Sequence, residues 1–194
     1  MMKKIVIVIA AIAVVFINPH ISRAEGKPRN LSGLEFFLGY TRGELDQRED
    51  YRFISAAVAL DFDFKAITKK IGFNPSSLVR FQIEPFLGLV TQPENNMEAG
   101  TSFLFKFGLA PETWKFQPYL KVGTGMVYMT QHTREQSTQF NFISSLGAGL
   151  HYFFEEKSAF TLEYRFRHTS NAGIKDPNKG IDTYTCLFGI TRIF

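Results

Sequence analysis

The stretch that decides the fold is residues 160–167, which read Phe-Thr-Leu-Glu-Tyr-Arg-Phe-Arg. Large apolar side chains occupy the even positions, and Thr, Glu and Arg occupy the odd ones. An alternation with a period of two is typical of a β-strand whose two faces meet different surroundings. One face here carries charges such as Glu163 and Arg165, and the other carries mainly aromatic rings. We therefore expect a strand that separates a polar space from an apolar one.

The same alternation recurs in five further stretches of the chain, around residues 34–41, 79–84, 102–109, 140–154 and 183–191. A soluble β-sandwich also alternates, with its apolar face turned inward. The inverted arrangement is favoured because bulky aromatics crowd one face, while Gly, Ser and Thr share the other face with charges. Apolar-out and polar-in strands of about ten residues are typical of transmembrane barrels. Closure of such a barrel satisfies every backbone polar group, as lipid requires.

The pattern predicts an all-β fold, an eight-stranded antiparallel transmembrane β-barrel. The expected strands are residues 32–43, 51–65, 77–91, 97–109, 114–130, 138–154, 158–170 and 181–194. Long polar connections alternate with short ones along the chain, as outer loops and periplasmic turns do. Lys65–Ser76 departs from this pattern, because it is a long connection on the periplasmic side. An even number of strands leaves both termini in the periplasm.

The two faces of the strands predict where particular side chains lie. Charged residues of the polar face are expected to pair within the barrel lumen, since buried charges need partners; they are Glu35, Asp61, Asp63, Glu84, Lys106, Lys121, Glu163, Arg165 and Arg167. Five aromatic residues are expected at the membrane interfaces: Trp114, Tyr119, Tyr128, Tyr152 and Tyr164. The last strand ends in Phe194, which resembles the terminal signal of outer-membrane barrels.

The first residues predict export. Lys3 and Lys4 precede an unbroken apolar run of 13 residues, and Ser22-Arg23-Ala24 follows. This layout is typical of a cleaved secretory signal peptide, and the apolar run is too short for a spanning helix, which needs about 20 residues. We expect residues 1–24 to be a signal peptide and residues 25–194 to form the outer-membrane β-barrel.

Composition excludes several classes of function. The signal peptide holds three of the 22 basic residues and none of the acids, so the mature chain has 19 bases against 18 acids. No basic tract is present, and no nucleic-acid partner is expected. The single cysteine, Cys186, cannot form an internal disulfide. No sequence spacing typical of metal ligands occurs, so no metal and no cofactor are expected.

One polar segment interrupts the outward-facing side of the barrel. His168 and Ser170 continue the aromatic face of residues 160–166, and Asp182 shares the parity of Tyr184 at the start of the last strand. A serine hydroxyl needs an adjacent base, and that imidazole needs an acceptor that fixes its tautomer. These types in this arrangement predict a nucleophile, a base and an acid at the outer rim. A site that faces lipid suits a substrate that is itself a lipid. The alternative is a polar rim and turn without chemistry.

The run His168-Thr169-Ser170-Asn171, with Asn178 and an acid at position 182, resembles the active-site motif of the outer-membrane lipid A 3-O-deacylase (PagL) family, also described as acyloxyacyl hydrolases. The resemblance is sharpest over residues 163–194. It implies that Ser170 is the nucleophile, that His168 is the general base, and that the acid at 182 is the third member. Family members carry Glu at that place, whereas this chain has Asp182.

The resemblance also implies an oxyanion hole formed or supported by Asn171, Gly173 and Asn178. The expected function is a serine esterase of the outer membrane that hydrolyses the 3-O-linked acyl chain of lipid A, or lipopolysaccharide, with its site facing the outer leaflet. Arg167, Lys175 and Lys179 are expected to meet the phosphates of lipid A. A homodimer is one assembly that the sequence allows. Two alternatives stay open, a non-enzymatic structural or adhesive barrel and a lipid A acyltransferase.

Overall fold

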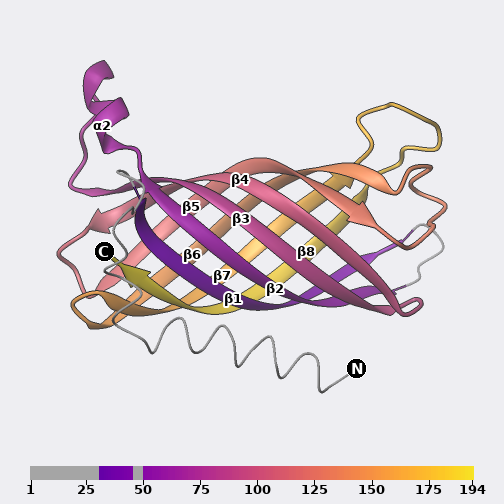
Figure 1. Ribbon diagram of the computed structural model, residues 1–194, viewed down its shortest axis with the longest axis horizontal. Coiled ribbons are helices and arrows are strands. Elements are labelled where there is room, and N and C mark those ends of the chain that lie inside the picture. The colour runs from indigo at the N-terminus through magenta and orange to yellow at the C-terminus, as the bar shows by residue number, and fades with distance from the viewer. Residues whose placement is uncertain (1–30, 46–49) are drawn as a thin grey trace, which may run out of the picture.

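The barrel is closed and antiparallel, with each strand paired to its neighbour in chain order and β1 paired to β8. The computed structural model describes residues 31–45 and 50–194. The expected signal peptide, residues 1–24, lies outside the described residues. The strands are β1 (Leu31–Glu44), β2 (Asp50–Asp63), β3 (Ser77–Gln92), β4 (Asn96–Pro111), β5 (Phe116–Met129), β6 (Phe140–Glu155), β7 (Ser158–Ser170) and β8 (Ile181–Ile193). The predicted eight-stranded barrel is confirmed (Figure 1).

The two ends of the barrel differ in their connections. Short turns follow β4 and β6 at one end, where β8 also ends and where α2 (Lys65–Thr68) and η2 (Lys69–Ile71) project from the β2–β3 connection (Figure 1). Longer loops follow β5 and β7 at the other end. Short turns face the periplasm and long loops face outward in barrels of this kind. The loops after β5 and β7 are therefore the outer ones.

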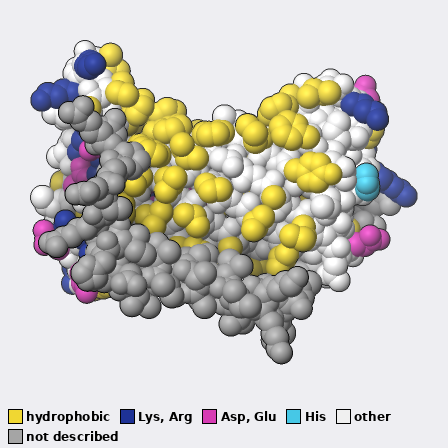
Figure 2. Space-filling model, in the orientation of Figure 1, with side chains coloured by type: hydrophobic (Ala, Val, Ile, Leu, Met, Phe, Trp, Pro, Cys, Tyr) yellow, Lys and Arg dark blue, Asp and Glu magenta, His cyan; other side chains and the backbone are white. Residues whose placement is uncertain are grey.

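The outer surface of the strands is apolar. Figure 2 shows hydrophobic side chains spread over the middle of the barrel, with Lys, Arg, Asp and Glu confined to its two ends. Leu162 and Phe188 are more than half exposed although both are large and apolar. Exposed apolar side chains in this number mark a surface made for a non-aqueous partner. No helix among the described residues is long and apolar enough to cross a membrane.

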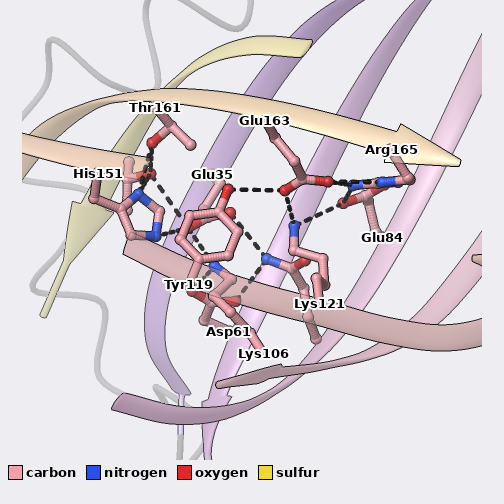
Figure 3. A network of polar contacts seen from close by, with 12 residues as sticks. Glu35, Asp61, Glu84, Lys106, Tyr119, Lys121, His151, Thr161, Glu163 and Arg165 are labelled. Carbon is pink, nitrogen blue, oxygen red and sulfur yellow. Dashed lines mark hydrogen bonds and ion pairs between the residues drawn. The ribbon is translucent and has the colours of Figure 1, made fainter. Parts of the chain in front are cut away.

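Paired charges occupy the barrel lumen (Figure 3). Lys106 Nζ lies 2.6 Å from Glu35 Oε1 and 3.1 Å from Asp61 Oδ2. Further along the barrel, Glu163 lies 2.6 Å from Lys121 Nζ and 2.5 Å from Arg165 Nη2. These side chains are fully or almost fully buried. The predicted lumen network is confirmed for them, and each charge has the partner that burial demands.

The predicted locations of two side chains are wrong. Tyr119 does not lie at the membrane interface, because its side chain enters the lumen and its hydroxyl donates a 2.8 Å hydrogen bond to Glu163. Gly149 pairs with Tyr119 across the sheet and leaves the room that this ring fills. Arg167 is not a rim cation, because its guanidinium binds Glu98 inside the barrel at 2.6 and 3.1 Å. The alternative prediction for Arg167, a lumen charge, is the one that the structure supports.

Candidate active site

The pairing of β7 with β8 sets His168 directly opposite Asp182. Both side chains point outward, with 41% and 59% of their surfaces exposed, and His168 Nδ1 lies 2.6 Å from Asp182 Oδ1. When Nδ1 carries the proton, it donates to the carboxylate and leaves Nε2 free to accept one. The shorter Asp therefore reaches the imidazole from this position on β8. This is the orientation that a general-base histidine requires.

Ser170 is the last residue of β7 and shares the outward face of His168. Its hydroxyl makes no hydrogen bond within the part of the chain that the structure describes. The two predicted partners of His168 thus lie on the same face, and only Asp182 is in contact with it.

Sequence reasoning missed a second serine, which lies beside His168. Ser144 on β6 pairs with His168 from the side opposite to Asp182, and it is also exposed on the outer surface. Directly opposite side chains on neighbouring strands have Cβ atoms about 5 Å apart. The pairing of β6 with β7 was the missing information, since no local pattern marks Ser144.

Gly180 fixes the direction in which the His168 ring points. A Cβ atom at position 180 would lie 2.5 Å from His168 Cε1 and 3.1 Å from Nε2, so the ring edge packs against the glycine backbone. Gly180 has φ +82°, which also favours glycine. This residue precedes β8 at the outer end of the barrel, so the Nε2 edge points toward the outer loops. Ser170 follows His168 in that same direction. Sequence reasoning passed over Gly180 because a glycine before a strand looks like an ordinary turn residue.

The loop between β7 and β8 is held by the three residues that were expected at an oxyanion hole. The Asn171 backbone N–H donates to Asn178 Oδ1 at 2.8 Å, and the Gly173 N–H donates to Asn171 Oδ1 at 3.0 Å. The Asn171 amide donates to the Lys175 carbonyl at 2.6 Å. Asn171 is fully buried and uses its side chain within the loop. The Asn178 amide nitrogen makes no hydrogen bond to the described residues, so it remains available to a ligand.

The loop after β5 forms hydrogen bonds with the β7–β8 loop. The Ser137 hydroxyl donates to the Lys175 carbonyl at 2.8 Å, and its N–H donates to the Pro177 carbonyl at 3.1 Å. Gln136 forms an isolated bridge with Asn178. These contacts join residues 38 to 42 positions apart in the chain, and for that reason no sequence pattern predicted them. Lys175 is exposed at this rim.

A hollow on the outer surface begins beside Asp182. Its lining includes Tyr40, Tyr164 and Tyr184 together with Arg42 and Glu44. Cys186 on β8 pairs with Tyr40 on one side and with Tyr164 on the other. The small cysteine between two large rings makes the hollow, which is open to the membrane. No group of three His, Cys, Asp or Glu that could hold a metal ion occurs among residues 31–45 and 50–194.

Comparison with known proteins identifies the family. The profile described as lipid A 3-O-deacylase (PagL) matches residues 34–191. Curated protein sequences give no match. The crystal structure of the outer membrane enzyme PagL superposes with a TM-score of 0.62 at 18% identity, over 79% of this chain and 97% of that one.

Two other solved barrels share the fold. Neisserial surface protein A superposes with a TM-score of 0.63 at 9% identity, over 84% of this chain and 97% of that one. The N-terminal barrel domain of Pseudomonas aeruginosa OprF gives 0.50 at 12% identity, over 86% and 100%. Identities this low speak for the architecture alone, whereas the family profile spans most of the sequence. The chain belongs to the lipid A 3-O-deacylase (PagL) family and is a lipid A deacylase of the outer membrane.

Proposed function

We propose that the chain is a serine esterase that hydrolyses the 3-O-linked acyl chain of lipid A. The observation that carries the proposal is the 2.6 Å contact between His168 Nδ1 and Asp182 Oδ1 on the lipid-facing surface, one step along the same face from Ser170. An imidazole held in this way keeps Nε2 as a base. A polar trio on a surface that meets lipid suits an ester within the membrane.

In the proposed reaction, Ser170 Oγ attacks the ester carbonyl while His168 Nε2 takes its proton. The tetrahedral oxyanion collapses, the sugar 3-hydroxyl leaves with that proton, and the acyl chain stays on Ser170. Water then attacks the acyl-enzyme with His168 as base again, and a free 3-hydroxy fatty acid leaves. Asp182 holds the imidazole and stabilises its charged form.

The oxyanion needs donors that are already in place, and one such donor often contributes about 3–4 kcal/mol. The free amide nitrogen of Asn178 is the group that we assign to this role. Asn171 and Gly173 support it, because their hydrogen bonds fix the loop that carries Asn178. The exposed Lys175 is placed to meet a phosphate of the substrate.

The two serines beside His168 give a matched test. Ser170→Ala should abolish the release of fatty acid from lipid A in detergent micelles, whereas Ser144→Ala should retain it, with both variants folded as heat-modifiable barrels. Fragment mass spectra of the product should place the lost chain at the 3-position. Retained activity in Ser170→Ala, or its loss only in Ser144→Ala, would overturn the assignment of the nucleophile. A product heavier than the substrate would instead indicate acyl transfer.

Two further expectations stay predictions. Cleavage after Ala24 falls on residues that the structure does not describe, and a homodimer can be tested by sedimentation of the protein in detergent.

A further inference from the structure

The β2–β3 connection departs from the short turns that the periplasmic end otherwise carries. It contains α2 and η2, and it exposes Ile67, Ile71 and Phe73 to 52%, 81% and 47%. Ile67 and Ile71 are four residues apart and share one face of the helical segment, whereas Lys69 lies on the opposite face. The segment therefore has an apolar side and a basic side, although it is only a few residues long.

The base of this segment is fixed to the barrel. The Lys65 side chain pairs with Glu112 of the next periplasmic turn, and Arg80 lies 2.8 Å from both Glu112 Oε2 and Asp63 Oδ2. The Lys65 backbone N–H also donates to Asp63 Oδ1 at 2.8 Å. Because these contacts anchor the segment, the direction of its apolar face is set by the barrel.

That apolar face is continuous with the apolar side chains on the outer surface of β3 and β4. Phe64 precedes α2, and its ring lies 5.3 Å from that of Phe105 on β4, which in turn packs against Phe107 and Phe81. Figure 2 shows hydrophobic side chains running from the barrel surface onto the flank of the projection that faces the barrel, with basic side chains on its far side. Figure 1 shows that the projection stands away from the barrel wall rather than along its axis.

Two exposed lysines adjoin the apolar face, Lys69 opposite Ile67 and Lys70 next to it in the chain. Among residues 31–45 and 50–194, neither lysine pairs with a carboxylate. Lysines beside a membrane surface bind anionic headgroups, and amphipathic segments lie in the interface with their apolar side toward the acyl chains.

We propose that residues 64–73 form a docking surface for anionic phospholipid of the inner leaflet. Ile67, Ile71 and Phe73 enter the boundary of the acyl chains, and Lys69 and Lys70 bind phosphate headgroups at the periplasmic edge. This contact sets the depth of the barrel in the membrane at the end opposite to the candidate active site, and it is independent of the proposed esterase chemistry.

Depth-dependent quenching tests the apolar side. In a Trp114→Phe background, which removes the only tryptophan, Ile71→Trp and the opposite-face control Lys69→Trp are reconstituted as full-length barrels into vesicles of equimolar phosphatidylglycerol and phosphatidylcholine. Lipid brominated on its acyl chains should quench Ile71→Trp strongly and Lys69→Trp weakly, and iodide in the buffer should do the reverse. Ile67→Trp serves as a second reporter of the apolar face if Ile71→Trp does not fold. Equal quenching on both faces, or strong quenching of the apolar face by iodide, would overturn the proposal and favour a periplasmic protein as the partner.

Lipid selectivity tests the basic side. The preference of the barrel for spin-labelled phosphatidylglycerol over phosphatidylcholine should fall by up to about fivefold for each of Lys69→Gln and Lys70→Gln, the factor that corresponds to about 1 kcal/mol per lysine near an anionic surface. Lys157→Gln, in a short turn at the same end, should leave the preference nearly unchanged. An undiminished preference in the double Lys69→Gln/Lys70→Gln variant would contradict the assigned headgroup contact.

Discussion

Gly180→Ala should lower the turnover rate of a protein that still folds, and the size of the loss can be estimated from the structure. The new Cβ would lie 2.5 Å from His168 Cε1, whereas carbon atoms in contact normally stay about 3.5–4.0 Å apart, so the ring must move by about 1 Å. The ring cannot move freely, since its Nδ1 is held 2.6 Å from Asp182. A displacement of this size at a reacting group costs about 10²-fold in rate. We therefore expect kcat to fall about 10²-fold with little change in KM.

Gly72→Ala is the matched control. Gly72 has φ +80° against +82° for Gly180, but nothing lies within 4 Å of its added Cβ. Both variants force alanine into the left-handed region, at a cost of about 1–2 kcal/mol in stability. The unfolding free energy should fall in both variants, and at least as much in Gly180→Ala because of its contact with His168, while only Gly180→Ala loses turnover. The assay is the initial rate of fatty-acid release at equal amounts of folded protein. A folded Gly180→Ala variant with normal kcat would refute the idea that Gly180 orients His168.

The remaining predictions concern the acid, the lumen and export. Asp182→Asn should lower turnover by roughly 10–10³-fold, which is less than the loss in a buried protease triad because this carboxylate is exposed. Asp182→Glu should stay active. If Asp182→Asn has a normal rate and Asp176→Asn loses activity, the acid that orients His168 is Asp176 in the β7–β8 loop. Lys106→Met leaves two buried carboxylates without their cation and should lower the free energy of unfolding by about 3–5 kcal/mol in urea titrations, an effect that an unchanged midpoint would exclude. N-terminal sequencing of the membrane-extracted protein should begin at Glu25, after Ala24, and an intact Met1 would contradict the expected cleavage.

Strand positions could be predicted from the sequence because each strand of a barrel carries its own two-sided pattern. The expected strand at 158–170 has the observed bounds, and the others differ by no more than two residues at either end. Tyr119 shows that residue type can mislead where strand parity does not. It lies two residues before Lys121 and so shares that residue's lumen face, although a tyrosine near a strand end is typical of the membrane interface. What the strand alone could not show is Gly149 on the neighbouring strand, which leaves the space for the ring.

The candidate active site could likewise be predicted only in part. His168, Ser170 and Asp182 could be placed on the outward face by parity, since His168 and Ser170 lie an even number of residues from Phe166 on β7 and Asp182 lies two residues from Tyr184 on β8. Ser144 and Gly180 could not be placed, because one belongs to another strand and the other acts through a backbone contact. Asn171 was predicted near the oxyanion, but its side chain is committed to the Gly173 N–H and the Lys175 carbonyl. The sequence shows that Asn171 is polar, but it does not show whether its amide donates to a ligand or holds the loop in place.

The lumen charges have a consequence for the outer surface, because side chains alternate along a strand. Arg167 binds Glu98 at 2.6 Å inside the barrel, and its Nε donates to Thr183 at 3.2 Å across the β7–β8 pair. Arg167 and Thr183 immediately adjoin His168 and Asp182, which pair on the outer face. A slip of one residue would send His168 into the lumen and break both pairs. The Arg167–Glu98 pair joins β7 to β4 across the lumen and holds this face of β7 inward, while the Arg167–Thr183 hydrogen bond holds β7 in register with β8. That register brings the imidazole and the carboxylate together in the face that meets lipid.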